Sequence, residues 1–234
     1  MLYFTVGDYL NRKSAASAAC EITIGMRMVL VDWMVEVQEN FELNHETLYL
    51  AVKLTDMYLD RVNVTKDELQ LVGSTAMFIA AKFDERLPPV ADDFIYICDD
   101  AYSRDQLLEM EISILTRLGF DIGLPLSYRF LRRYAKTTGA PMDLLTLARF
   151  ILEMSLMYYD FVSERDSRLG AAVFLLALRM KSPDEPAEKL WTNNHVLYSG
   201  YALSDLESLV DRLNGMLHKS LPKNIRTVKA KYSH

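Results

Sequence analysis

The sequence has little of what marks a disulfide scaffold, a metal site or a membrane span. Its two cysteines, Cys20 and Cys98, are far apart, and no cluster of cysteine and histidine surrounds either one. This usage is typical of a reducing compartment and predicts neither a disulfide framework nor a metal site. The longest uninterrupted apolar run covers only residues 171–178, far less than a bilayer span, so we expect no membrane partner.

A recognisable catalytic set is also missing. The sequence has no glycine-rich phosphate loop, and its four histidines occur in unrelated contexts. The net charge is −6, and before the basic stretch at 223–231 no run of lysine or arginine is longer than Arg132-Arg133. Because nucleic-acid binding needs a basic surface, this balance argues against a nucleic-acid partner. We expect a protein that is not an enzyme and needs no cofactor.

What the sequence does contain is helical periodicity, and half of its residues are hydrophobic, enough for a substantial core. No segment alternates as a strand would. Asn44 is a suitable helix N-cap, Ser103 and Gln106 form a capping-box pattern, and Gly119 is placed to end a helix. The predicted helices cover about 24–41, 45–61, 66–84, 91–98, 103–118, 126–138, 142–161, 165–181, 187–199 and 203–219.

These segments fall into two similar halves. Residues 76–81 (AMFIAA) resemble residues 172–177 (AVFLLA), and the third segment of each half is rich in alanine, which lets helices approach closely. We interpret 120–125 as an extended linker and predict four parts. They are an N-terminal extension with a short helix (1–22), two five-helix bundles (23–122 and 123–222) and a basic C-terminal tail (223–234).

One stretch, MRMVLVDWMVEV (26–37), carries the most information. It is apolar on two sides of a helix, so both sides need a covering element or a partner. Arg27 and Asp32 interrupt the apolar run, and buried charge is costly unless it is paired. We therefore expect each of them to have a partner.

This stretch closely resembles the opening helix of the cyclin box of mitotic A- and B-type cyclins. The resemblance continues through NHETLYLAVKLTDMYLD (44–60), LQLVGSTAMFIAAKFDE (69–85) and DDAYSRDQLLEMEISILTRLGFDI (99–122). The second half looks like the weaker second box of B-type members, so the resemblance covers roughly 22–232. It implies an all-α fold of two tandem five-helix cyclin boxes plus a short N-terminal helix.

The resemblance also implies a function, which is to bind and allosterically activate a cyclin-dependent Ser/Thr kinase in G2/M. In the family a lysine and a glutamate grip the kinase's regulatory helix, and the matching residues here are Lys82 and Glu111. The apolar contact positions around them are Phe83, Leu115, Phe120 and Ile122. ATP and magnesium belong to the kinase. From the residues alone, a surface salt bridge of little energetic weight is the favoured explanation of the Lys82–Glu111 pair.

A second implied site is a shallow groove that docks Arg-x-Leu peptides of substrates and inhibitors. The matching positions are Met26, Val29, Leu30, Trp33, Glu36, Leu69 and Gln70. The apolar side chains would receive the leucine, and Glu36 the arginine. Helical spacing by itself favours core burial for this stripe. Arg27 and Asp56 match the family's buried structural ion pair.

Several further expectations remain open. Arg132, Arg133 and Arg149 form either a phosphate pocket on the second box or a solvated helix face. In the N-terminal extension, Phe4, Tyr9 and Leu10 either contact the kinase or belong to a loosely held arm. The family's upstream destruction motif is absent, so we expect a longer natural protein. The resemblance implies nuclear localisation with possible shuttling. The rival interpretations are a scaffold of the same fold and a degenerate cyclin that binds a kinase without activating it.

Overall fold

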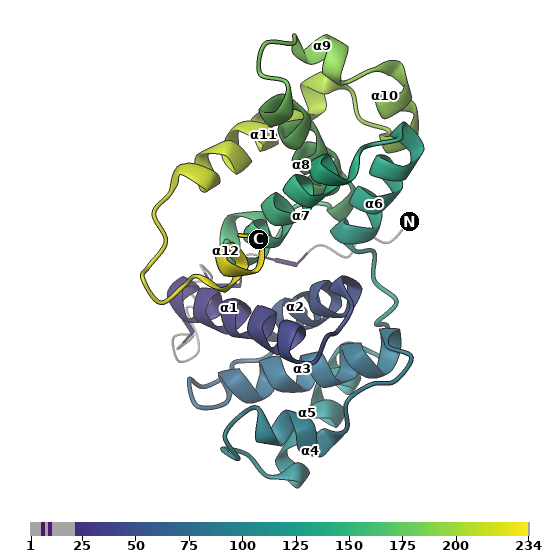
Figure 1. The fold of residues 1–234 in the computed structure, drawn as a ribbon. Helices are drawn as coiled ribbons and strands as arrows, with labels where there is room; N and C mark the ends of the chain where they lie inside the picture. Colours follow the sequence, from purple (N-terminus) through teal and green to yellow (C-terminus); the bar gives the residue numbers. More distant parts are fainter. Residues whose placement is uncertain (1–5, 8, 11–21, 234) are drawn as a thin grey trace. The chain divides into compact units, whose positions relative to one another are not determined.

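The computed structural model describes residues 6–7, 9–10 and 22–233, and within these ranges the regular elements are helices, with no strand (Figure 1). The chain divides into two compact units. Unit 1 comprises Met1–Leu124 and Met157–Ser163, and unit 2 comprises Pro125–Leu156 and Glu164–His234. The all-α prediction is confirmed. The predicted N-terminal helix falls on residues that lie largely outside the described ranges.

Unit 1 is built around one central helix. Its helices are α1 (Ile24–Asn40), α2 (His45–Leu59), α3 (Leu69–Asp84), α4 (Ala91–Tyr96) and α5 (Arg104–Arg117). Helix α3 contacts the other four and lies between the α1–α2 pair and the α4–α5 pair (Figure 1). It is buried at nearly every position from Leu69 to Ala81, because glycine and alanine let its neighbours approach closely. The expectation that the third helix is the hub holds here.

Unit 2 repeats this plan around α8 (Asp166–Lys181), which contacts α6, α9, α10 and α11. Gly73 of α3 and Gly170 of α8 are both the fifth residue of their hub helix. A Cβ atom on Gly170 would lie 3.0 Å from the Ser127 carbonyl oxygen, so glycine lets α6 and α8 pack backbone to backbone. The other elements of unit 2 are α6 (Ser127–Thr138), most of α7 (Met142–Met157), α9 (Ala187–Leu190), α10 (Asn193–Ser199), α11 (Leu203–His218) and α12 (Thr227–Lys231).

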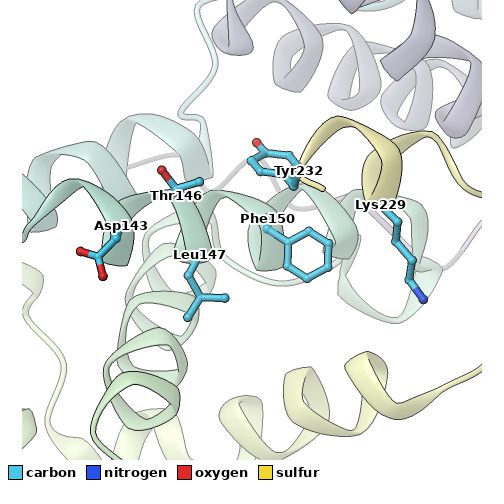
Figure 2. Close-up of a pocket in the computed structure, with 6 residues that line it drawn as sticks. All are labelled: Asp143, Thr146, Leu147, Phe150, Lys229 and Tyr232. Carbon is cyan, nitrogen blue, oxygen red and sulfur yellow. The ribbon is translucent and has the colours of Figure 1, made fainter. Parts of the chain in front are cut away.

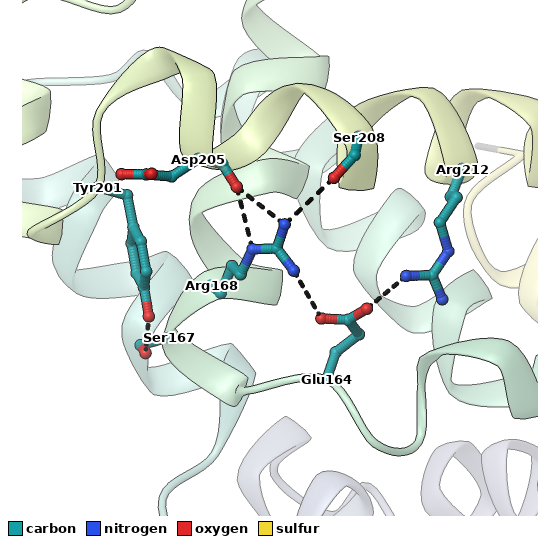
Figure 3. A network of polar contacts seen from close by, with 7 residues as sticks. All are labelled: Glu164, Ser167, Arg168, Tyr201, Asp205, Ser208 and Arg212. Atoms are coloured by element: carbon teal, nitrogen blue, oxygen red, sulfur yellow. Dashed lines mark hydrogen bonds and ion pairs between the residues drawn. The ribbon is translucent and has the colours of Figure 1, made fainter.

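Polar contacts fix α11 against the start of α8 (Figure 3). The Arg168 guanidinium donates to the Asp205 carbonyl oxygen through Nε at 3.0 Å and Nη2 at 2.9 Å. It also donates to the Glu164 carboxylate at 3.1 Å, and Arg212 of α11 donates to the other oxygen of that carboxylate. Glu164 therefore joins the two helices through two arginines.

Two predicted helices are interrupted in the structure. Helix α7 ends at Met157, and a short 3-10 turn, Tyr159–Phe161, follows as part of unit 1. The segment predicted at 187–199 is two helices, because the Trp191 indole N–H donates to the Tyr201 carbonyl at 3.0 Å and Thr192 starts α10 with a capping box. These contacts outweigh the local helical pattern.

The capping box of Ser103 and Gln106 is confirmed, and Asn44 occupies the N-cap position of α2 as predicted, although its side chain bonds elsewhere. Asn44 precedes α2, yet its side chain does not cap the helix. Its backbone and side-chain N–H groups both donate to the Glu85 carboxylate, at 2.6 and 2.7 Å. The Glu85 carboxylate at the end of α3 thus accepts the hydrogen bonds that Asn44 donates at the start of α2.

Among the described residues, no helix is long and apolar enough to cross a membrane. In the same part of the chain, no group of three or more histidine, cysteine or acidic side chains is arranged to hold a metal ion. Cys98 is a buried free thiol.

Candidate functional site

Lys82 and Glu111 meet at the surface of unit 1. Lys82 lies in the last turn of α3 and Glu111 in the middle of α5, and the Lys82 ammonium donates a hydrogen bond to Glu111 Oε1. The same ammonium lies 3.9 Å from the centroid of the Phe78 ring, a favourable cation–π contact. The Lys82 side chain is 41% exposed and that of Glu111 13%. The pair is therefore oriented by its neighbours and still open on one side.

Apolar side chains flank the ends of the two helices that carry this pair. Phe83 is 49% exposed and Phe120 is 67% exposed, and Leu115 and Ile122 are half-buried. Large exposed aromatic side chains on a folded protein are typical of a surface that a partner covers.

The backbone at Phe120 differs from the predicted extended linker. Gly119 has φ +66° and Phe120 has φ +59°, and the Phe120 N–H donates to the Leu115 carbonyl at 2.8 Å. Phe120 is therefore part of the cap that ends α5. A positive φ is unfavourable for a bulky residue, and such backbone strain is concentrated at functional sites.

Unit 2 contains a counterpart of the Lys82–Glu111 pair. Arg179 is the fourteenth residue of α8, as Lys82 is of α3, and it donates to Glu207 of α11 at 2.6 Å. A cation at the end of the hub helix paired with a glutamate on a later helix is thus common to both units. The two units differ at the next position. In unit 1 the exposed aromatic residue Phe83 follows Lys82, whereas Met180 follows Arg179 in unit 2.

The predicted peptide groove lies on α1 and α3, two helices in contact. Leu30 and Leu69 are buried, Val29 is 47% exposed, and Glu36 is exposed. Met26, Trp33 and Gln70 are half-buried. The stripe is thus neither wholly core nor wholly surface, as a groove with an apolar floor requires.

Gly73 sets the distance between these two helices. A Cβ atom at this position would lie 2.8 Å from Leu30 Cδ1, which is closer than any normal contact. The absence of a side chain at Gly73 is what allows Leu30 to lie against α3.

Arg27 and Asp56 form a buried ion pair. Arg27 Nε donates to Asp56 Oδ1 at 2.6 Å and Nη2 donates to Oδ2 at 2.7 Å. Tyr9 also donates to Asp56 Oδ1, at 2.7 Å, and packs edge-on against Tyr159. Burial and the Asp56 charge raise the pKa of the Tyr9 phenol well above its ordinary value. Tyr9 is therefore buried in unit 1, which argues against the alternative of a loosely held arm at this residue.

Of the three arginines assigned to a phosphate pocket, two lie near one aromatic ring. The guanidinium carbons of Arg132 and Arg149 are 5.9 and 5.8 Å from the centroid of the Tyr128 ring. Arg132 and Arg133 are exposed on α6, and Arg149 is half-buried on α7. Arg149 Nε is buried and has no hydrogen-bond partner among the described residues.

Sequence reasoning missed a second buried carboxylate. Glu153 of α7 is fully buried, and it accepts hydrogen bonds from Lys231 Nζ at 2.6 Å and from the Tyr232 hydroxyl at 2.9 Å. Burial, and then the Glu153 charge, raise the pKa of Tyr232 strongly. The signal was present, since Glu153 interrupts an apolar stretch as Arg27 does. The segment predicted as a basic tail thus supplies a cation to the interior of unit 2.

Comparison with known families identifies the fold. Residues 5–123 match the family described as cyclin, N-terminal domain, and residues 125–234 match cyclin, C-terminal domain. The chain belongs to the cyclin family. This confirms the resemblance inferred from the sequence and the prediction that the chain is a regulatory protein and not an enzyme.

The relatives of this cyclin include the G2/mitotic-specific cyclin-B3 of Gallus gallus. It is 54% identical over 231 residues, which cover 99% of this chain and 55% of the relative. The Drosophila melanogaster protein of the same name is 50% identical over 232 residues, which cover 99% of this chain and 39% of the relative. The chain therefore spans about half of the first relative and less of the second. The X-ray structure of a viral cyclin from herpesvirus saimiri shares the fold, with a TM-score of 0.67 and 23% identity over 92% of this chain and 87% of that one.

Proposed function

We propose that this chain is the cyclin-box region of a mitotic B-type cyclin that binds and activates a cyclin-dependent Ser/Thr kinase in G2/M. The names of the relatives support the mitotic assignment. The observation that carries the kinase proposal is the half-open Lys82–Glu111 pair, flanked by the exposed side chains of Phe83 and Phe120. Because a similar ion pair, Arg179–Glu207, occurs in unit 2, the proposal relies on the exposed aromatic side chains as well as on the charged pair.

The mechanism follows from what a protein kinase needs. Its strand lysine must pair with a glutamate on a mobile helix before the ATP phosphates are held productively. A partner that binds only the inward position of that helix shifts the kinase toward activity. Moving the equilibrium from 1:99 to 99:1 takes a preference of roughly 5.5 kcal/mol. Phe83, Leu115, Phe120 and Ile122 would supply apolar contact, and the charged pair would orient the helix through its remaining hydrogen-bonding capacity.

The groove on α1 and α3 would recruit substrates. Its buried leucines form an apolar floor for the leucine of an Arg-x-Leu peptide, and Glu36 is exposed where a carboxylate can receive the arginine. Glu36→Lys should abolish binding of a labelled Arg-x-Leu peptide and leave activity toward a short peptide substrate unchanged. Retention of peptide binding would rule out this groove.

Two further roles complete the proposal. Arg132 and Arg149, with Arg133 nearby on α6, would bind a phosphoserine or phosphothreonine of a partner, because guanidinium groups suit phosphate. Nuclear localisation, with shuttling to the cytoplasm, rests on the family resemblance and is tested by imaging the full-length protein in cells.

The decisive experiment measures kinase activity. This chain is titrated into a purified monomeric cyclin-dependent kinase with ATP, magnesium and a Ser/Thr-Pro peptide. We expect saturable activation that is lost in Lys82→Ala/Glu111→Ala. The matched control is Arg179→Ala/Glu207→Ala, which removes the corresponding pair of unit 2 and should keep nearly full activation.

Other outcomes separate the rival interpretations. Binding without activation would identify a degenerate cyclin, and failure to bind several such kinases would favour a scaffold. An equal loss in both double variants would mean that the pairs act only on folding.

A further inference from the structure

Unit 2 has a pocket between α7 and α12, apart from the sites described above (Figure 2). Its volume is about 350 Å³, at the lower end of the range for ligand pockets in proteins. That size suits one large side chain better than an extended cofactor. The lining residues are Asp143, Thr146, Leu147, Phe150, Lys229 and Tyr232.

The pocket is preformed because α12 is fixed to α7. The Phe150 and Tyr232 rings pack with centroids 5.8 Å apart at an interplanar angle of 62°. The Tyr232 hydroxyl and the Lys231 ammonium both bind the buried carboxylate of Glu153. Leu147 and Phe150 extend from the same side of α7 (Figure 2) and both line the pocket, so an apolar surface is available without rearrangement.

The two ends of the pocket differ in charge. At one end the Asp143 carboxylate accepts a hydrogen bond from Lys181 at 2.6 Å, so its charge is compensated. At the other end, Lys229 extends from α12 beside Phe150 (Figure 2) and forms no ion pair within the described part of the chain. The uncompensated charge of the pocket is positive.

The surrounding segment is also basic. Residues 219–233 carry Lys219, Lys223, Arg226, Lys229 and Lys231 and no acidic residue, in a chain whose net charge is −6. A basic segment on a protein of negative net charge attracts acidic ligands. A nucleic acid would need a longer basic stripe than this segment provides.

We propose that the α7–α12 pocket binds an acidic peptide segment of a partner protein that carries one large apolar side chain. The apolar side chain enters between Leu147 and Phe150, and a carboxylate next to it pairs with Lys229. This site lies wholly within unit 2, and it does not depend on the kinase-binding proposal.

The test uses the whole chain and a fluorescein-labelled peptide of aspartate and glutamate residues around a single phenylalanine. Fluorescence polarisation should give saturable binding that weakens as salt is added. Lys229→Glu should raise the Kd by about tenfold or more, since an attractive ion pair with the peptide is replaced by repulsion. The matched control, Lys223→Glu, makes the same charge change on the same segment outside the pocket and should alter the Kd by less than about threefold.

A second arm changes the probe and leaves the protein intact. Replacing the phenylalanine of the peptide by serine should abolish saturable binding, which no folding defect can mimic. Equal effects of Lys229→Glu and Lys223→Glu, or undiminished binding of the serine peptide, would mean nonspecific attraction to the basic segment and overturn the proposal. Absence of binding to the wild-type chain would overturn it as well.

Discussion

The guanidinium of Arg27 and the carboxylate of Asp56 are joined by two hydrogen bonds in the interior of unit 1, and both side chains are almost completely buried. Unit 2 contains a similar arrangement of Glu153 with Lys231. In each unit a tyrosine hydroxyl, from Tyr9 or Tyr232, completes the coordination of the carboxylate. A buried pair adds little net stability over apolar packing, but losing one partner strands the other charge.

Removal of either partner of the unit 1 pair should be strongly destabilising. Arg27→Ala or Asp56→Ala should each lower the free energy of unfolding by about 3–5 kcal/mol, because the remaining charge stays buried. Urea denaturation followed by circular dichroism measures the change. Arg104 and Asp92 form an exposed pair at 3.6 Å, and Asp92→Ala is the control with little expected effect. Similar losses in Asp56→Ala and Asp92→Ala would contradict the prediction.

For the Glu153–Lys231 pair of unit 2, we expect that a second substitution recovers stability lost in the first. Lys231→Met should destabilise the chain by roughly 3 kcal/mol by removing the Lys231 ammonium from the buried Glu153 carboxylate. Adding Glu153→Gln should recover a large part of the lost stability, because the buried negative charge is then gone. The interaction energy from the double-mutant cycle measures the coupling. Additive effects of the two substitutions would show that Lys231 does not stabilise the Glu153 carboxylate.

The buried tyrosines predict a loss of stability in alkali. The pKa values of Tyr9 and Tyr232 are raised in the folded chain, by burial first and then by their carboxylate partners. The folded state therefore keeps protons that the unfolded state loses above about pH 10, so stability is full below that pH and falls as the pH rises. Urea unfolding at about pH 8 and about pH 10.5 should show a smaller decrease in Tyr9→Phe and Tyr232→Phe than in the wild type. Tyr198→Phe, at an exposed tyrosine, should behave as the wild type does.

Gly73 should not tolerate alanine. The added methyl group would displace Leu30, so Gly73→Ala should cost about 1–3 kcal/mol of stability and weaken Arg-x-Leu peptide binding. Gly215 of α11 has open space around its Cα atom, and Gly215→Ala should raise the free energy of unfolding by about 0.5–1 kcal/mol. The two substitutions are chemically the same. Opposite changes in the free energy of unfolding would therefore attribute the loss in Gly73→Ala to the contact with Leu30. A change of the same sign in both variants would count against that contact as the cause.

Substitution of Phe120 should lower the affinity for the kinase without lowering the stability of the fold. Phe120→Gly removes an exposed aromatic side chain and favours the positive φ of this position, so stability should be unchanged or rise by up to about 1 kcal/mol. The affinity for the kinase should fall by at least about tenfold if Phe120 is an anchor of that interface. Surface plasmon resonance with the purified kinase measures it, and Leu197→Ala, at an exposed residue of unit 2, is the control. Unchanged affinity would remove Phe120 from the proposed interface.

The helices, the two hubs and the family were predictable because their signals are local. Apolar spacing and the small residues of α3 and α8 are visible within one helix length. The capping box of Ser103 and Gln106 joins residues that are close in the sequence. The cyclin resemblance then supplied the roles of Lys82 and Glu111, which remain predictions for their contact with a kinase.

The features that were not predicted depend on contacts between residues that are distant in the sequence. The Glu153–Lys231 bond joins positions 78 residues apart, and the Glu85 carboxylate reaches Asn44 across 41 residues. A local pattern cannot indicate either contact, so the end of the chain was interpreted as a tail, and the bond between Asn44 and Glu85 was not expected. Phe120 was misassigned for a related reason, since the hydrogen bond to Leu115 turns a linker-like sequence into the end of a helix.

The assignment of Met157–Ser163 to unit 1 has a consequence for how the protein is made. A ribosome that has completed residue 124 has synthesised all five helices of unit 1, but not Tyr159, which packs on Tyr9, nor the Met157 carbonyl, which accepts from Arg27. Those contacts form only after α6 and all of α7 have also been translated. Unit 1 is therefore not complete when its first 124 residues have been made, and the nascent chain carries Arg27 and Asp56 with their environment unfinished while residues 125–156 of unit 2 are synthesised.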